Sequence, residues 1–270
     1  MNIVRESICR YHRAFSIALS LGLSAIAFST QAETVSVAVA ANFIKPMKEI
    51  AEQFYQTTGH RAILSFGSSG KLYAQIRNGA PFEVFLSADQ SKPDALVLQG
   101  LAIEGSQFTY ALGALVLWSA KPNQFKNDID YKTNSAADIL KQGNFNKLAI
   151  ANPQLAPYGK AALEILDHLG LKETIKPKLV QGQNIAQTYQ FVSSGNAQLG
   201  LLSRSQITEA DSSYNHFFWA IPKKLYSPIR QDAVLLRTGK NTTAAKALMD
   251  YLRSAKTKAI IDRFGYNSEP

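Results

Sequence analysis

The stretch VSVAVAANF, residues 35–43, sets the pattern for the whole chain. Its first six residues are small or β-branched and largely apolar, which is typical of a parallel strand buried on both faces. Phe43, Met47, Ile50 and Phe54 then recur at helical spacing. A buried strand that runs directly into an amphipathic helix is the repeating unit of an α/β fold.

The same order of strand and helix continues along the chain. Further strands are expected at 62–66, 82–86, 115–119, 148–151, 199–202 and 233–236. Helices are expected from Ser69, as N-cap, to Ile76, and at 136–141, 160–169, 185–194 and 244–264. Strands that alternate with helices predict parallel sheets and an α/β class.

The N-terminus has the pattern of a secretory signal. Three arginines precede an uncharged apolar run at 15–28, and small and polar residues follow before Glu33. The run is shorter than the ~20 residues that a membrane-spanning helix needs, so a membrane anchor is the weaker alternative. We predict a signal peptide at 1–32, cleaved after Ala32, and a periplasmic location.

The residue content excludes most enzyme chemistry. Cys9, inside the predicted signal peptide, is the only cysteine, so the rest of the chain has no disulfide, thiolate metal site or cysteine nucleophile. The histidines are isolated, and no G-x-S-x-G stretch occurs. The excess of 29 Lys and Arg over 20 Asp and Glu is scattered along the chain. Neither catalysis nor nucleic-acid binding is therefore expected.

Four strand-to-helix turns share an unusual composition. Gly67–Lys71 resembles a phosphate-binding loop, but Ser65 and Leu72 stand where the P-loop pattern requires Gly and Ser or Thr. What remains is a small-residue turn that exposes backbone N–H groups at a helix start. The turns at 40–42, 152–159 and 182–184 are built similarly, and none of the four contains an acid. Because ligands of open α/β sheets sit at such turns, we expect an anion-binding site.

At these turns the sequence resembles the periplasmic molybdate-binding proteins, the capture components of molybdate ABC importers. The resemblance spans essentially the whole chain beyond the predicted signal peptide. The matching stretches are 37–43, 65–72, 79–90, 152–153 with 157–159, 195–200 and 226–229. The serine turn and Ser87-Ala88-Asp89-Gln90 are the most specific of them.

The resemblance implies a type II periplasmic binding protein with two lobes, each a mixed, mainly parallel sheet flanked by helices. Lobe I would comprise 33–112 and 231–270, and lobe II 113–230. It further implies a monomer that binds molybdate or tungstate without a cofactor, holds the metal only within its oxyanion, and meets a membrane permease. The family's ligand contacts fall on Asn42, Ser69, Tyr158 and Ile185, with Ala41 and Ser68 as neighbouring candidates.

Two departures from the family leave the ligand's identity open. One branch has serine where this chain has Asn42. A tyrosine that contacts the anion there falls here on Ser203, which is too short to reach as far, so that contact is lost or passes to Tyr158. Sulfate, phosphate and ferric ion are the alternative ligands, and a secreted enzyme on the same fold is the alternative function.

Overall fold

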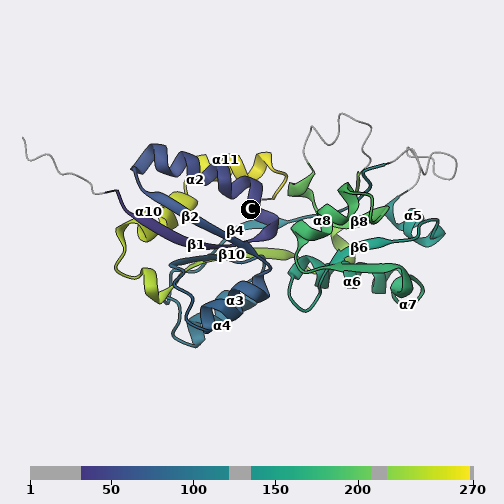
Figure 1. The fold of residues 1–270 in the computed structure, drawn as a ribbon, viewed down its shortest axis with the longest axis horizontal. Helices are drawn as coiled ribbons and strands as arrows, with labels where there is room; N and C mark the ends of the chain where they lie inside the picture. Colours follow the sequence, from purple (N-terminus) through teal and green to yellow (C-terminus); the bar gives the residue numbers. More distant parts are fainter. Residues whose placement is uncertain (1–31, 122–134, 208–217, 268–270) are drawn as a thin grey trace, which may run out of the picture. The chain divides into compact units, whose positions relative to one another are not determined.

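The computed structural model describes residues 32–121, 135–207 and 218–267, which form two five-stranded sheets (Figure 1). The first sheet has the order β2-β1-β3-β10-β4. Its strands are β1 (Thr34–Ala40), β2 (Arg61–Gly67), β3 (Val84–Leu86), β4 (Phe108–Gly113) and β10 (Ile229–Leu235). β2, β1 and β3 run parallel, whereas β10 is antiparallel to both β3 and β4.

The second sheet repeats this arrangement in the order β7-β6-β8-β5-β9. Its strands are β5 (Leu115–Trp118), β6 (Leu148–Ala151), β7 (Leu179–Gly182), β8 (Leu199–Ser203) and β9 (Phe218–Ala220). β7, β6 and β8 are parallel, and β5 is antiparallel to β8 and β9. Each sheet is therefore mixed, with parallel and antiparallel pairings equal in number, because one strand, β10 in the first sheet and β5 in the second, runs against the other four.

Helices cover both faces of the first sheet. They are α2 (Ile44–Thr58), α10 (Thr243–Leu252) and α11 (Ala255–Arg263) on one face, and α3 (Ser69–Arg77) and α4 (Ser91–Leu98) on the other (Figure 1). Val35, Val37 and Val39 of β1 pack into the first layer, whereas Ala38 packs into the second. All four side chains are fully buried, which confirms a strand covered on both faces.

The second sheet carries α5 (Ala136–Gln142), α6 (Pro157–His168), α7 (Lys172–Ile175) and α8 (Ile185–Ser193). Short 3-10 turns complete the described elements: Ala41–Phe43, Lys176–Lys178, Arg204–Gln206, Lys223–Leu225 and Arg237–Gly239. The second sheet and its helices enclose one core that includes Trp118, Leu148 and Ile165. We refer to each sheet with its helices as a lobe.

Three expectations about the helices were wrong. The single helix expected at 244–264 is two helices, because Ser254 is extended and its hydroxyl caps α11 by accepting the N–H of Thr257. Helix α6 begins at Pro157, three residues before the expected start. Ser68, not Ser69, is the N-cap of α3, since the Ser68 side chain accepts the N–H of Lys71.

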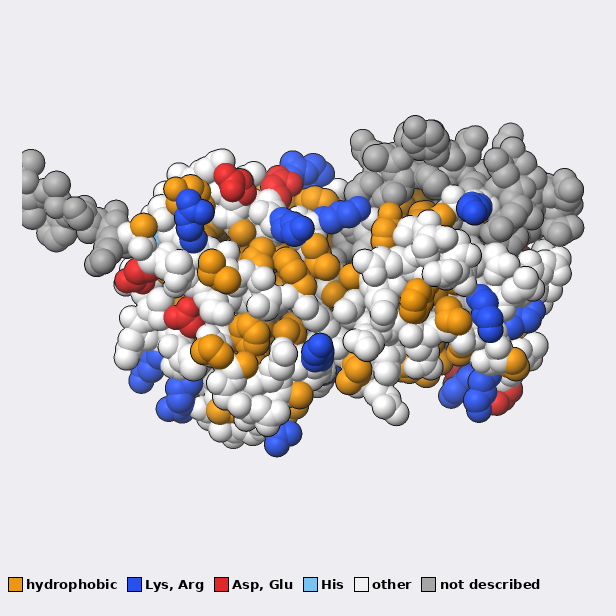
Figure 2. All heavy atoms as spheres, in the orientation of Figure 1, with side chains coloured by type: hydrophobic (Ala, Val, Ile, Leu, Met, Phe, Trp, Pro, Cys, Tyr) orange, Lys and Arg blue, Asp and Glu red, His pale blue; other side chains and the backbone are white. Residues whose placement is uncertain are grey.

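The chain passes between the sheets from β4 to β5 and again from β9 to β10. The two-lobed α/β class is confirmed, while the expected lobe limits stay a prediction. No helix within the three described ranges has the length and apolar character that crossing a membrane requires. Lys and Arg side chains are dispersed over the face drawn in Figure 2 and form no continuous basic patch there.

Candidate functional site

The four predicted contact residues come together around one small cavity of about 10 Å³. Asn42 and Ser69 reach it from the first lobe, and Tyr158 and Ile185 from the second, and each is at most 3% exposed. The rest of the lining is small or uncharged: Ala40, Ala41, Gly67, Ser68, Ala88, Ala156, Pro157 and Asn184. Among the described residues, no Lys, Arg, Asp, Glu or His side chain lines the cavity.

Each of the four residues stands where a helix begins. Ser69 and Ile185 are the first residues of α3 and α8, and Tyr158 is the second residue of α6. Asn42 lies in the 3-10 turn that leads into α2. N–H groups in a first turn have no acceptor within their own helix, and the helix dipole makes this end positive. The cavity therefore offers backbone N–H donors to an anion rather than side-chain cations.

Ser69 adds a side-chain donor to this set. Its Oγ accepts the N–H of Ala88 at 2.9 Å, so the hydroxyl hydrogen is left to donate. Because Ala88 also lines the cavity, this bond fixes the hydroxyl at the cavity wall. Lys71, two positions along α3, is exposed and lies outside the lining.

The Asn42 side chain is engaged behind the cavity. Its amide donates to Gln231 Oε1 at 2.7 Å and to the Tyr266 hydroxyl at 2.9 Å. An amide NH₂ has two hydrogens, and these two bonds use both. The backbone N–H of Asn42 is therefore the donor of this residue that remains to face the cavity.

The Tyr158 hydroxyl oxygen is likewise engaged by neighbouring side chains. It accepts from Gln231 Nε2 at 3.2 Å and from Ser203 Oγ at 3.0 Å. Ser203 thus supports Tyr158 from behind instead of reaching the cavity. Burial, together with the neighbouring Tyr266, raises the pKa of Tyr158 well above that of an exposed tyrosine. Tyr158 is therefore neutral at physiological pH and presents no negative charge to an anion.

Three residues of this buried network were missed from the sequence. Gln231 lies on β10 and is fully buried; Tyr110 lies on β4, and its hydroxyl donates to Gln231 Oε1 at 3.1 Å. Tyr266 follows α11 and donates to the carbonyl oxygen of Asn42 at 2.9 Å. The available signal was a glutamine next to an aspartate inside a strand whose other residues are mostly apolar.

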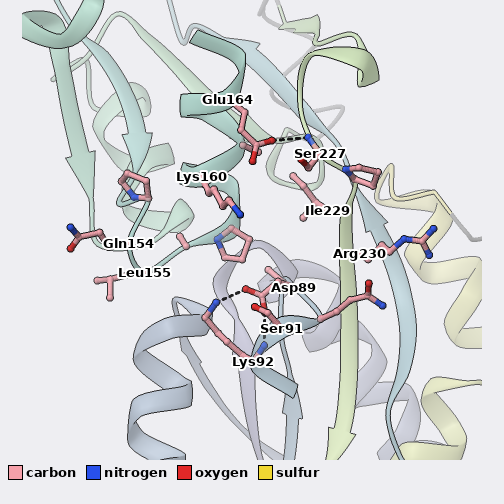
Figure 3. A pocket seen from close by; sticks show the side chains of 17 residues that line it. Asp89, Ser91, Lys92, Gln154, Leu155, Lys160, Glu164, Ser227, Ile229 and Arg230 are labelled. Atoms are coloured by element: carbon pink, nitrogen blue, oxygen red, sulfur yellow. Dashed lines mark hydrogen bonds and ion pairs between the residues drawn. The ribbon is translucent and has the colours of Figure 1, made fainter. Parts of the chain in front are cut away.

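A larger pocket of about 400 Å³ adjoins the small cavity and shares Ala88, Ala156 and Pro157 with it. We call it the vestibule; Figure 3 shows its charged side chains. Asp89 forms an ion pair with Lys92, and Glu164 accepts the N–H of Ser227 at 2.7 Å. Lys160 and Arg230 also line it, so cations gather beside the uncharged cavity and not inside it.

The chain is similar to known proteins over nearly its whole length beyond the predicted signal peptide. The family model of the bacterial extracellular solute-binding proteins matches residues 35–267. The molybdate-binding protein ModA of Azotobacter vinelandii is 50% identical over 250 residues, which cover 93% of this chain and 96% of that protein. ModA of Rhodobacter capsulatus is 45% identical over 256 residues, covering 95% and 96%.

Among solved structures, the periplasmic molybdate-binding protein of Azotobacter vinelandii superposes with a TM-score of 0.80 and 37% identity. The match covers 87% of this chain and all of that one. Sequence and fold thus agree over nearly the full length of both proteins. The chain belongs to the bacterial extracellular solute-binding proteins and, within them, to the family of the molybdate-binding proteins.

Proposed function

We propose that this chain captures molybdate or tungstate between its two lobes and delivers it to the membrane permease of an ABC importer. The observation that carries this proposal is the uncharged cavity at which the starts of α3, α6 and α8 and the turn before α2 meet. Such a site stabilises a dehydrated anion with oriented N–H and O–H donors. The ModA relatives, at 45–50% identity, support molybdate as the ligand.

Each proposed contact has a defined donor. Asn42, Tyr158 and Ile185 would each give a backbone N–H, and Ser69 would give both its N–H and its hydroxyl. Ala41 and Ser68 are neighbours in the same wall and are secondary candidates. The metal is enclosed in its own oxygen atoms, so no protein atom needs to ligate it directly.

The donor set also bears on the alternative ligands. Hydrogen phosphate carries a proton that needs an acceptor, and a cavity of donors would leave that proton unpaired. Sulfate is smaller than molybdate, so the same donors would bond it less well. Ferric ion needs oxygen ligands such as carboxylates or phenolates. The lining offers no carboxylate, and the one phenol, that of Tyr158, is bonded to Ser203 and Gln231.

The cellular setting follows from the same proposal. The predicted signal peptide, 1–32, lies almost wholly outside the described residues, and it would deliver the chain to the periplasm. There the protein would act as a monomer that binds an ion without converting it, and the permease would be its macromolecular partner. The lining holds Ser68 and Ser69 but, among the described residues, no histidine, cysteine or acid that could activate them, which favours binding over catalysis against the alternative of a secreted enzyme.

Isothermal titration of residues 33–270 with molybdate, tungstate, sulfate and phosphate tests the proposal. We expect sub-micromolar binding of the first two ions and none of the others. Tight binding of sulfate or phosphate alone would show that the proposed ligand is wrong, while the proposed site would stand. The absence of a binding heat with all four oxyanions would refute oxyanion capture.

A further inference from the structure

Next to Ser69, the backbones of the two lobes touch directly. The N–H of Gly70, the second residue of α3, donates to the carbonyl oxygen of Leu155 at 2.9 Å. Leu155 precedes α6 in the second lobe, one residue before Ala156 of the cavity lining. Because the Gly70 N–H lies in a first turn, it has no acceptor in its own helix. Contact between the lobes supplies that acceptor.

Gly70 leaves no room for a side chain at this contact. A Cβ built on it would lie 3.0 Å from the Leu155 carbonyl oxygen and 3.1 Å from the Leu155 Cα. Such separations are shorter than ordinary van der Waals contacts, and both atoms belong to the backbone. The φ angle of Gly70 is not in the left-handed region, so its own conformation does not require glycine. Alanine would favour the helix more, and the close approach alone explains glycine here.

The Leu155 carbonyl is held in a fixed turn and cannot easily retreat. The N–H groups of Leu155 and Ala156 both donate to the Asn152 carbonyl oxygen, at 3.1 and 2.9 Å. The Asn152 side chain also accepts the N–H of Gln154 at 2.9 Å. A methyl group at Gly70 would therefore push the α3 start and this turn apart rather than bend the turn.

We infer that the Gly70–Leu155 contact is a backbone latch that sets oxyanion affinity by permitting full closure of the lobes. This inference rests on the proposed function, because closure matters only if the cavity between the lobes binds an ion. Ser69 and Ala156, the neighbours of the two latch residues, both line that cavity. A separation at the latch thus moves the donors of one lobe away from those of the other.

The test is Gly70→Ala, titrated with molybdate beside the wild-type chain. Loss of one hydrogen bond corresponds to about a five- to ten-fold weaker affinity. Gly70→Val, with a larger side chain at the same point, should weaken it further. The unfolding temperature of ligand-free Gly70→Ala should not fall, because alanine is the better helix former. Weaker affinity without a loss of stability is a result that simple damage to the fold does not produce.

Two control variants separate the backbone from the side chains. Leu155→Ala keeps the carbonyl and should bind like wild type, and so should Gln75→Ala, an exposed change in the same helix. Unchanged affinity in both Gly70 variants overturns the latch while the proposed function stands. Equal weakening by Leu155→Ala and Gly70→Ala overturns it too, because the side chain would then carry the contact. A wild-type chain that binds no oxyanion overturns both proposals.

Discussion

The two walls of the cavity supply donors in different ways. The first lobe contributes the serine pair, whose hydroxyls cap α3 at Ser68 and bond Ala88 at Ser69. The second lobe contributes Tyr158 and Ile185, whose side chains are buried in the core around the second sheet. In the first wall, residue identity matters through a side-chain hydroxyl. In the second wall, it matters through the position of the main chain.

Because of this difference, the second wall should tolerate more substitutions than the first. Any residue that keeps α8 in place offers the same N–H at Ile185, whereas only Ser or Thr offers a hydroxyl at Ser69. Substitutions in the two walls should therefore have different effects. First-wall changes should act on affinity, and second-wall changes should act on binding only when they move the backbone.

The largest effect is expected for Gly159→Ala, in the second wall. A Cβ at Gly159 would lie 2.1 Å from the carbonyl oxygen of Ala151, at the end of β6. The α6 start must then shift, which costs roughly 3 kcal/mol of unfolding free energy and removes the Tyr158 N–H from the cavity. Urea unfolding and titration with molybdate should show both losses. Asp167→Ala, exposed on the same helix, is the control and should show neither.

Ser69→Ala should weaken binding next most strongly. It removes a charge-assisted hydrogen bond worth about 1.5–3 kcal/mol, so affinity for molybdate should fall roughly 10- to 150-fold. The matched variant in the other wall is Ile185→Val, which keeps its N–H. That variant should lose about 0.5–1.5 kcal/mol of stability but no affinity. If titration found the two variants equally impaired, the contrast between the walls would be wrong.

The walls also differ in how far the sequence predicted them. Helix starts depend on local chemistry, so the small-residue turns around Asn42 and Ser69 indicated the donors before any contact was known. The pattern of apolar residues places the start of α6 three residues too late, whereas Pro157 marks it correctly. Proline at a first helical position was the better signal.

The buried hydrogen-bond network behind the two walls could not be predicted from local sequence in this way. Asn42 bonds Gln231 and Tyr266 across 189 and 224 positions of sequence, and no local pattern encodes such partners. The expected strand at 233–236 also excluded Gln231, because its polar neighbour Asp232 interrupts the apolar run. Asp232 is nevertheless buried and bonded to Thr109, Gln90 and Gln107. Only the tertiary fold brings these polar groups together.

Tyr158→Phe should test this network with a smaller effect. It removes the acceptor of the buried Gln231 amide, which should cost about 1–2 kcal/mol of stability, while affinity falls less than about ten-fold. The two effects can be measured by urea unfolding and by titration. Large affinity loss without loss of stability would mean that the hydroxyl contacts the ligand directly, contrary to the geometry.

The same variant has a pH signature. Burial raises the pKa values of Tyr110, Tyr158 and Tyr266 in the folded chain, so the unfolded chain loses these protons first as pH rises. Wild-type stability should therefore be full below about pH 10 and decline above it. Tyr158→Phe has one such group fewer and should decline less steeply. Equal slopes for the two proteins would contradict the assigned burial of this hydroxyl.

The smallest effect concerns the vestibule rather than either wall. Lys160 is exposed and lines the vestibule, and it forms no ion pair with another described residue. Its charge should attract an incoming dianion without contacting it once bound. Lys160→Glu should therefore slow association about two- to five-fold at low salt, lose this effect above roughly 0.5 M salt, and leave dissociation unchanged.

Stopped-flow binding measures this change in association rate. The variant Lys246→Glu separates the effect of the position of the charge from that of the net charge of the chain. Lys246 is exposed on α10 and lines neither pocket, so the two variants carry the same total charge. An equal slowing in both would mean that the overall field of this basic chain, and not the vestibule, draws in the ion. A slowing confined to Lys160→Glu would show that the chain keeps its cations beside the cavity for capture and leaves the binding itself to neutral donors.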